Sequence, residues 1–422
     1  MSFIISFKNE FNKYTIIDSK TKEISVVDNV GYEIYDRRFK MSKKYAETEE
    51  GIKQYLNDFI ILCKEMRDRK MFHIDYKKYY CDNTAVVRVF IENTRKKILD
   101  MFDDIDLKEM IWINGCYNGG LTFVAPGIYN CFGYDYKMFY PTILGSREHN
   151  MVFRFPTKRG KQYKVKKLNF NKPLRFGYYK CMITSEHPDR KKLFAFSSKN
   201  IYTNYSIEFA HNHLTEYGFK VELIVDDKTE GYYNAYLYDD DCIIESHKVF
   251  NEWFYKLKSM REDLPKNPLV KFLASSLSGQ LMAYNLQLIR KNEITDEMDA
   301  RLCAFHDNMN TKKYDKAIFD IVYDDFDPDN DTYKIIDLHK PMKYNVGRFK
   351  AFLMAFARNI TASTAMIDLP NVVRIHTDGL VFTKPQDFSK FDVGCKSFIF
   401  PEDKTTGHIN FKALNTYNNI IS

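Results

Sequence analysis

The stretch Asp135-Tyr136-Lys137-Met138-Phe139-Tyr140-Pro141 closes a run of apolar and aromatic residues that begins at Ile128. Such a run predicts a β-strand over 128–136. Pro141 has no main-chain N–H and cannot continue the hydrogen-bond ladder of a central strand. Asp135 is therefore expected near the end of this strand, with Tyr140 in the turn that follows it.

A second stretch, Ile375-His376-Thr377-Asp378-Gly379, lies about 240 residues further along the chain. Strand-like runs flank it at 372–376 and 380–382, and Asp-Gly is a favoured dipeptide in a tight hairpin turn. We therefore expect Asp378 at the tip of a hairpin. Asp-Gly occurs in hairpin turns whatever the function of a protein, so Asp378 alone carries no functional argument.

The two aspartates together suggest a specific chemistry. Attack of a 3′-hydroxyl on an α-phosphate builds negative charge on the attacking and leaving oxygens, and two Mg²⁺ ions about 4 Å apart stabilise it. Rigidly held carboxylates are the ligands that such ions require. An aspartate that ends one strand and an aspartate at a hairpin tip of its neighbour are expected to supply this geometry.

Length, composition and charge limit the classes of protein to which this chain can belong. The chain has 422 residues, 45% of them hydrophobic, and a formal charge of +7. No apolar run approaches the roughly 18 residues of a membrane span, and the N-terminal residues lack the pattern of a signal peptide, so we expect a cytoplasmic protein with no membrane partner. The eight cysteines form no Cys-x-x-Cys pair, which argues against a zinc ribbon or a disulfide framework.

Basic residues cluster at 37–44, at Arg95-Lys96-Lys97, and from Lys158-Arg159 through Lys166-Lys167. Clusters of this kind suit a polyanionic partner. Each is equally well explained as a solvated surface.

Hydrophobic periodicity places helices over 48–67, 86–101 and 348–363. Residues 145–244 contain many short strand-like segments and are expected to form an inserted unit. Residues 245–292 are expected to be helical, with a break marked by Pro265 and Pro268.

Three motifs resemble those of family B DNA polymerases. Asp135-Tyr136-Lys137-Met138-Phe139-Tyr140-Pro141-Thr142 resembles their first palm motif, and Lys271-Phe272-Leu273-Ala274-Ser275-Ser276-Leu277-Ser278-Gly279 resembles the fingers motif. His376-Thr377-Asp378-Gly379 falls where the family has Asp-Thr-Asp-Ser. The motifs occur in the family's order, and the resemblance covers about residues 50 to 415. It implies an α+β fold with an antiparallel palm sheet, helical fingers and an inserted strand-rich subdomain.

The resemblance narrows to the protein-primed branch found in phages and linear mobile elements, because Tyr117-Asn118-Gly119-Gly120 resembles that branch's Tyr-x-Gly-Gly segment. It implies six segments: an N-terminal region with an exonuclease remnant (1–115), the first part of the palm (116–146), an insertion that docks a priming protein (147–245), the fingers (246–292), a second insertion (293–340), and the second part of the palm with a truncated thumb (341–422).

Carried over by position, the family's roles fall on thirteen residues of this chain. Asp135 and Asp378 would be the catalytic metal ligands, assisted by the main-chain carbonyl of Tyr136, with Mg²⁺ as cofactor and Mn²⁺ as a substitute. Tyr140 would lie under the incoming sugar. The other implied contacts are Lys258, Lys271, Ser276 and Gly279 for the nucleotide, Tyr117, Gly119 and Gly120 for the template, and Lys412 and Tyr417 for the primer.

Several departures from the family pattern are informative. Met138, Ser275 and Ser278 replace the usual Ser, Asn and Tyr, and His376 replaces the first Asp of the hairpin motif. No Asp-x-Glu strand motif precedes residue 115, so we expect no proofreading. Only 44 residues follow Asp378, too few for a full thumb. A partner subunit is then expected to supply primer grip or processivity.

The sequence thus predicts a template-directed DNA polymerase that uses template, primer and dNTPs in phage or mobile-element replication, within the host cytoplasm if viral. Two alternatives remain open. One is an inactive or weak polymerase-like subunit of a replication complex, favoured by the degraded fingers motif and short thumb. The other is a primase or a template-independent nucleotidyl transferase. The residues leave the priming mode undecided.

Overall fold

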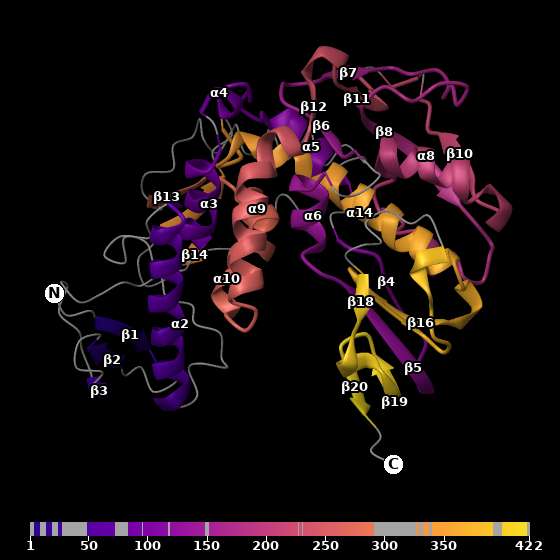
Figure 1. The fold of residues 1–422 in the computed structure, drawn as a ribbon. Helices are drawn as coiled ribbons and strands as arrows, with labels where there is room; N and C mark the ends of the chain where they lie inside the picture. Colours follow the sequence, from indigo (N-terminus) through magenta and orange to yellow (C-terminus); the bar gives the residue numbers. More distant parts are fainter. Residues whose placement is uncertain are drawn as a thin grey trace. The chain divides into compact units, whose positions relative to one another are not determined.

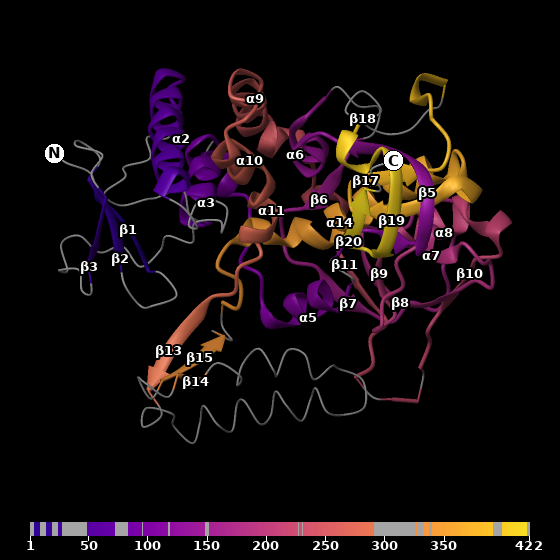
Figure 2. The same ribbon diagram turned by 90° about the horizontal axis from the view of Figure 1, so that it is seen from below.

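The computed structural model describes residues 4–8, 14–18, 24–27, 49–71, 83–94, 96–116, 119–147, 152–226, 228–229, 231–290, 326–327, 332–336, 340–390 and 399–419. The chain divides into two compact units (Figures 1 and 2). The first comprises Met1–Leu99, Leu144–Ser146 and His247–Gln280, and the second comprises Asp100–Ile143, Arg147–Ser246 and Leu281–Ser422.

The first unit is mainly helical. Its helices are α2 (Glu49–Asp68), α3 (Asn83–Glu92), α4 (Lys96–Leu99), α9 (His247–Asp263), α10 (Pro268–Ser275) and α11 (Leu277–Gln280). A separate antiparallel sheet has the order β1 (Ile4–Lys8), β2 (Tyr14–Asp18), β3 (Ile24–Val27). The predicted helix over 48–67 is confirmed as α2, whereas the helix predicted over 86–101 is broken after Glu92 into α3 and α4.

Aromatic packing and one capping residue organise this helical unit. Phe90 of α3 stacks on Phe250 of α9 with ring centroids 4.9 Å apart. The buried side chain of Asn267 accepts hydrogen bonds from the N–H groups of Leu269 and Val270, which caps α10, and donates to the carbonyl of Asp58 in α2. Pro268 occupies the first turn, where its missing N–H costs nothing. The predicted break near this proline is confirmed.

The second unit contains a seven-stranded antiparallel sheet. Its strand order is β20-β19-β5-β17-β16-β4, and β18 also pairs with β5. The bounds are β4 (Thr122–Val124), β5 (Gly127–Tyr136), β16 (Val372–His376), β17 (Gly379–Phe382), β18 (Ile399–Pro401), β19 (Gly407–Ala413) and β20 (Thr416–Asn419). The strands predicted over 128–136, 372–376 and 380–382 are confirmed.

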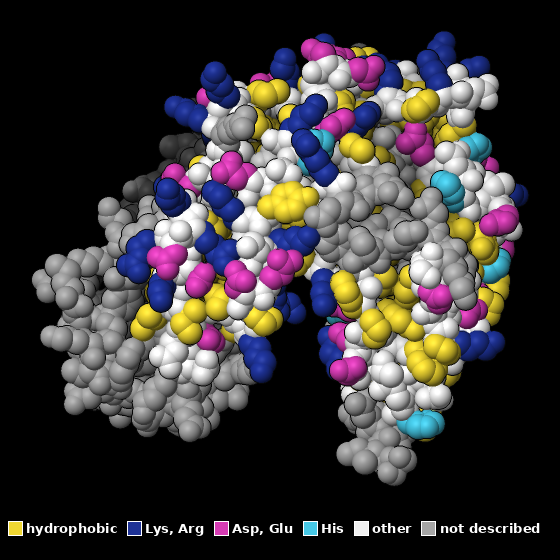
Figure 3. All heavy atoms as spheres, viewed as in Figure 1, with side chains coloured by type: hydrophobic (Ala, Val, Ile, Leu, Met, Phe, Trp, Pro, Cys, Tyr) yellow, Lys and Arg dark blue, Asp and Glu magenta, His cyan; other side chains and the backbone are white. Residues whose placement is uncertain are grey.

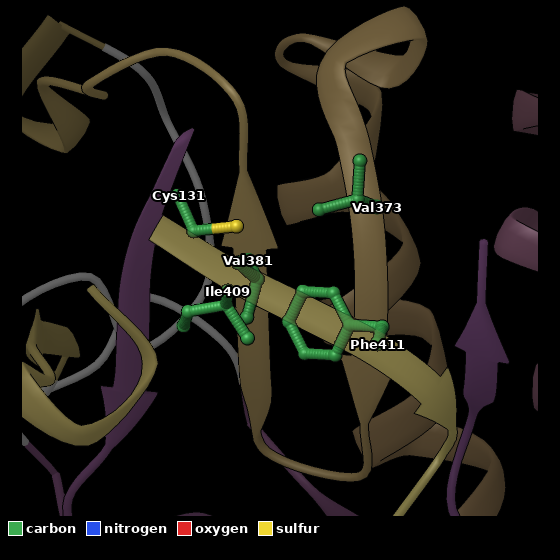
Figure 4. Packing of buried hydrophobic residues seen from close by; sticks show 5 residues of the cluster. All are labelled: Cys131, Val373, Val381, Ile409 and Phe411. Atoms are coloured by element: carbon green, nitrogen blue, oxygen red, sulfur yellow. The ribbon is translucent and has the colours of Figure 1, made fainter. Parts of the chain in front are cut away.

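A buried apolar cluster ties four strands of this sheet together. Figure 4 shows its members, Cys131, Val373, Val381, Ile409 and Phe411. They come from β5, from the β16–β17 hairpin and from β19, and β5 is far from the others in the sequence. Removing their apolar surface from water stabilises the pairing of these strands.

Helix α14 (Phe349–Met366) lies on the sheet face opposite to Asp135. Tyr136 points to it, because its hydroxyl is 2.7 Å from Thr364 Oγ1, while Asp135 points the other way by strand alternation. The helix is almost wholly buried, since a second group of strands covers it. Phe352 of α14 packs against Tyr178, with ring centroids 4.9 Å apart. The helix predicted over 348–363 is thereby confirmed.

The strands that follow the first aspartate motif form a second sheet. Its order is β10-β8-β11-β7, with β9 paired to β8, and β6 pairs separately with β12. The bounds are β6 (Arg154–Pro156), β7 (Lys161–Tyr163), β8 (Gly177–Thr184), β9 (Ile201–Thr203), β10 (Lys220–Leu223), β11 (Ala235–Leu237) and β12 (Ile243–Glu245), with helices α7 (Arg190–Leu193) and α8 (Asn204–His213) between strands. The strand-rich character predicted for residues 145–244 is confirmed.

A buried ion pair fixes the start of α14. Arg348 donates from Nε and Nη2 to the two carboxylate oxygens of Glu109 in α5 (Leu107–Gly115), at 2.8 and 2.9 Å, and both side chains are fully buried. The hydroxyl of Tyr238 donates to the same carboxylate at 2.8 Å. Arg348 Nη1 also donates to the carbonyls of Asp103 and Thr157. Such bidentate geometry satisfies the two buried charges.

Two local predictions are wrong. Tyr140 lies in the first turn of α6 (Phe139–Gly145) and not in a turn, because Pro141 is tolerated at the start of a helix. The helical stretch predicted over 245–292 ends at Gln280, and residues from Leu286 form strand β13 (Leu286–Arg290). This strand pairs with β15 (Thr332–Ile336), which also pairs with β14 (Phe326–Asp327).

Among the described helices, none has the length and apolarity to cross a bilayer.

Candidate active site

Asp135 and Asp378 lie on adjacent strands of the seven-stranded sheet. Asp135 is the penultimate residue of β5 and pairs directly with Gly379, the first residue of β17. The N–H of Tyr136 donates to the main-chain carbonyl of Asp378 at 3.0 Å. The structure therefore brings together the two aspartates that the sequence singled out.

The hairpin turn sits one residue earlier than predicted. His376 pairs with Gly379, so the two loop residues are Thr377 and Asp378. Thr377 has a φ of 64°, a left-handed conformation that is unusual for a β-branched residue. Gly379 is therefore not needed for the turn. A Cβ placed on it would lie 3.4 Å from Asp135 Oδ1, an ordinary contact.

Neighbouring elements hold this turn on two sides. The N–H of Thr377 donates to the carbonyl of Leu121 at 2.9 Å, and the hydroxyl of Thr361 in α14 lies 3.0 Å from the carbonyl of Thr377. A strained conformation persists only where its surroundings over-determine it. These contacts meet that condition and fix the main chain that carries Asp378.

The Gly119-Gly120 segment approaches the turn closely. A Cβ on Gly120 would lie 2.7 Å from Thr377 Oγ1 and 3.0 Å from Thr377 Cα. Arg358 of α14 donates from Nη1 to the carbonyl of Gly119 at 2.7 Å. The glycine pair predicted for template contact thus packs beside the turn that carries Asp378. Tyr117 lies outside the described residues.

Two cations, Arg374 and Lys404, interact with the carboxylate of Asp135. Arg374 lies two residues before His376 in β16 and so on the same face as Asp135. Its Nε donates to the carbonyl of Leu414 at 2.9 Å, and burial lowers its pKa, against the opposing effect of the nearby Tyr417, Glu402 and Asp135. Lys404 pairs with Glu402, and this hydrogen bond raises the Lys404 pKa. Strand alternation was the signal that could have identified Arg374 from sequence.

His376 occupies the position where the resembled motif has an aspartate. Partial burial lowers its pKa below 6.5, and the cation of Arg374 adds to this effect while Asp378 opposes it. The neutral imidazole therefore prevails near pH 7, and the face carries one negative charge less than the family pattern would give it.

Tyr140 and Lys350 lie together beside the end of β5. Lys350 Nζ is 5.8 Å from the centroid of the Tyr140 ring. Burial lowers the pKa of Lys350 to about 8. Lys350 was not singled out by sequence, since a lysine at the second residue of a helix has no distinctive pattern. Met138, with a φ of 49°, turns the chain from β5 into α6.

The four nucleotide contacts predicted within the fingers segment (246–292) all lie in the first unit. Lys258 is half-buried in α9 beside Tyr255, and Lys271 is exposed on α10. Ser276 ends α10, where its N–H donates to the carbonyl of Phe272. Apart from its chain neighbours and the backbone of its own helix, no described residue lies within 4 Å of a Cβ placed on Gly279. These four residues and the two aspartates belong to different units.

The predicted primer contacts lie on β19 and β20, the last two strands at one edge of the seven-stranded sheet. Lys412 is exposed in β19, next to an irregularity in its pairing with β20. Tyr417 of β20 pairs with Phe411 and lies under the guanidinium of Arg374, which is 5.1 Å from the ring centroid.

No protein-family model and no curated protein matches this chain. Among solved structures, phi29 DNA polymerase complexed with single-stranded DNA is similar, with a TM-score of 0.50 and 12% identity over 92% of this chain and 62% of the polymerase. The same polymerase complexed with primer-template DNA and incoming nucleotide substrates has a TM-score of 0.50 and 13% identity, over 92% and 63% of the two chains. The chain has a DNA polymerase-like fold.

That likeness concerns the fold alone, because identity is 12–13%. This chain spans less than two thirds of the length of the polymerase that it matches, at 62–63%. The mixed helical and antiparallel architecture agrees with the α+β class predicted from sequence.

Proposed function

We propose that this chain is a template-directed DNA polymerase that adds deoxynucleotides to a 3′-hydroxyl by the two-metal mechanism. The observation that carries the proposal is the placement of Asp135 and Asp378 side by side at the ends of β5 and the β16–β17 hairpin. The polymerase-like fold supports it, as do the cations Arg374 and Lys404 near Asp135, which suit an anionic substrate.

The donor set suits Mg²⁺. Among the described residues, no group of three or more His, Cys, Asp or Glu side chains is placed to hold a metal, so a closed all-protein cage is not available there. Mg²⁺ characteristically keeps several waters and binds through one or two carboxylates together with substrate phosphates. Asp135 and Asp378 would hold it, assisted by the Tyr136 carbonyl, with Mn²⁺ as a substitute. When bound, the metal supplies charge stabilisation at the attacking and leaving oxygens.

The remaining residues take roles in binding and positioning under this proposal. Tyr140 lies under the incoming sugar and excludes a 2′-hydroxyl, while Lys258 and Lys271 bind the triphosphate. Ser276 and Gly279 line the pocket that holds the newly formed base pair. Template contacts come from Tyr117, Gly119 and Gly120, and primer contacts from Lys412 and Tyr417.

We further propose that proofreading is absent, and that the chain serves phage or mobile-element replication. Priming by a protein docked on residues 147–245 and a partner subunit that completes primer grip belong to the same proposal. The alternatives are an inactive or weak polymerase-like subunit and a primase or template-independent transferase. His376 stands where the resembled hairpin motif has its first aspartate, so the site has one carboxylate fewer than that motif. This difference favours the first alternative.

The deciding experiment measures incorporation of labelled dNTPs with Mg²⁺ on a primed template, an unprimed template, and a primer without template. We expect extension of the primed template by wild type and a loss of several orders of magnitude in Asp378→Asn and Asp135→Asn. Asp240→Asn, an exposed residue of the same unit, is the matched control and should retain wild-type activity. Undiminished activity of Asp378→Asn would refute the proposal. Activity without template would favour the transferase, and inactivity of wild type would favour the subunit.

A further inference from the structure

The chain carries an uninterrupted basic segment outside the candidate active site. Residues 149–185 contain ten Lys and Arg residues and no Asp or Glu. The chain as a whole has 56 acidic residues among 422, so about five would be expected in a segment of this length. Most of these basic residues lie on β6, β7 and the connection that leads to β8.

Some of these cations have acidic partners. Arg159 lies 3.8 Å from Asp106, and both Lys161 and Arg175 contact Asp239, at 3.7 and 3.3 Å. Five others are exposed and make no ion pair with any described residue: Lys158, Lys164, Lys166, Lys167 and Lys172. These five lysines are called the basic strip.

The main chain under the strip is held in place although it lacks regular secondary structure. The buried side chain of Asn234 accepts from the N–H of Val165 at 2.7 Å and donates to its carbonyl at 2.8 Å. Further along, Phe170 stacks on His211 with ring centroids 3.6 Å apart, and the N–H of Leu174 donates to Glu208 at 2.7 Å. Lys164 and Lys166 therefore project from a fixed backbone on either side of Val165.

We propose that the basic strip binds the phosphate backbone of DNA, at a place separate from the candidate active site. This inference rests on the proposed function for its choice of polyanion. Exposed lysines that make no ion pair with a described residue have no such partner to give up on binding phosphate, and release of counterions from DNA drives such contacts. An acidic polypeptide would offer fewer and more mobile charges per unit length.

The strip contacts phosphates and not bases. The aromatic residues nearest the strip are already covered. Phe170 stacks on His211, Tyr163 lies under the guanidinium of Arg175 at 4.8 Å from its ring centroid, and Phe176 packs against Phe352. No described aromatic side chain between β7 and β8 is left for stacking on unpaired bases, the usual means of holding single strands. Binding is expected to be independent of sequence and strongly dependent on salt.

Within the second unit, the strip lies away from the two aspartates. In Figure 1, the connection between β7 and β8 is at the top of that unit, whereas β5 and β18 are at its lower end. Figure 3 shows dark blue side chains along this upper edge. The DNA segment bound by the strip would therefore be distant from the reacting 3′ end of the primer.

The test is fluorescence anisotropy of labelled single-stranded and duplex DNA, titrated with full-length protein over a range of salt concentrations. The strip variant is Lys164→Gln/Lys166→Gln/Lys167→Gln. Its matched control, Lys191→Gln/Lys220→Gln/Lys228→Gln, removes three exposed lysines from the same unit. Circular dichroism and a thermal melt of each variant establish that it is folded.

We expect the strip variant to bind duplex DNA at least about tenfold more weakly, with the slope of log K against log salt reduced by about 2 to 3, and the control to stay near wild type. Equal slopes for all three proteins would overturn the proposal, as would equally tight binding of poly-glutamate through the same lysines. A loss of affinity confined to single-stranded DNA would contradict the claim that the strip contacts phosphates and does not stack on unpaired bases.

The binding assay requires no catalysis, so its failure is distinguishable from failure of the proposed function. If wild type incorporates dNTPs while the strip variant binds DNA normally, only the strip proposal falls. If wild type incorporates nothing yet the strip variant loses DNA binding, the polymerase proposal falls and the strip proposal stands.

Discussion

Gly120 packs directly against Thr377, the residue that precedes Asp378 in the hairpin turn. A Cβ on Gly120 would lie 2.7 Å from Thr377 Oγ1, 2.8 Å from Cγ2 and 3.0 Å from Cα. The last of these atoms belongs to the main chain, so the contact cannot be relieved by rotating a side chain. The position of Asp378 therefore depends on the absence of a side chain at Gly120.

Gly120→Ala should shift the hairpin turn and lower the rate of dNTP incorporation by about 100-fold, because a displacement near 1 Å at a catalytic group has effects of this size. Gly379→Ala is the matched control in the same site. A Cβ there would meet its nearest atom, Asp135 Oδ1, at 3.4 Å, and its φ is not left-handed. It should keep most activity. Single-turnover rates would check both variants, and equal effects would contradict this account of the turn.

Thr361→Val removes the hydroxyl that lies 3.0 Å from the carbonyl of Thr377 and 3.1 Å from that of Ala357. The change preserves side-chain shape and leaves the Thr377 carbonyl without this partner, which should cost about 1–3 kcal/mol of unfolding free energy. Because Thr361 acts through the turn, we expect kcat to fall with little change in KM for dNTP.

Thr361→Ser retains the hydroxyl and should restore kcat most of the way. Urea unfolding and steady-state kinetics on one protein preparation would separate stability from positioning. A fall in stability with kcat unchanged in Thr361→Val would show that the hydroxyl has only a structural role.

His376 should make folding stability sensitive to acid. Its pKa in the folded chain is lowered from 6.5, mainly by burial, so the unfolded chain binds the proton more readily. Stability contributed by the neutral imidazole is present above pH 6.5 and is lost as the pH falls below that value. His376→Gln should show a smaller decrease in Tm between pH 7 and pH 5 than wild type.

The control is His408→Gln, an exposed residue of the same sheet. It should leave the acid-induced decrease in Tm unchanged. Thermal melts across this pH range provide the measurement, and parallel curves for wild type and His376→Gln would contradict the proposed linkage.

The Arg348–Glu109 pair should be a major contributor to the stability of the second unit. Arg348→Met leaves a buried carboxylate without its bidentate partner, and loss of one member of a buried pair costs about 3–5 kcal/mol. Arg348→Met combined with Glu109→Gln should be less destabilised than the sum of the two single variants. A double-mutant cycle in urea measures this coupling, and strict additivity would show that the pair does not act as a unit.

Much of the local structure could be predicted from sequence because it follows from short-range pattern. The apolar runs ending at Asp135 and flanking Asp378 correctly indicated strands, and the position of Pro268 correctly indicated a helix start. Boundaries failed where two conformations compete locally. Pro141 suits a first helical turn as well as the end of a strand, which is why Tyr140 was misplaced.

The sequence by itself determined the local elements and drew attention to Asp135 and Asp378, since each lies in a short pattern of strand, turn and polar residue. Tertiary structure decided that these residues meet, and which others support them. The register of β5 with β17, the approach of Gly120 to Thr377, and the reach of Thr361 and Arg358 from α14 each join residues distant in the chain. Such contacts follow from the packing of a shared core and leave no periodic trace in the sequence.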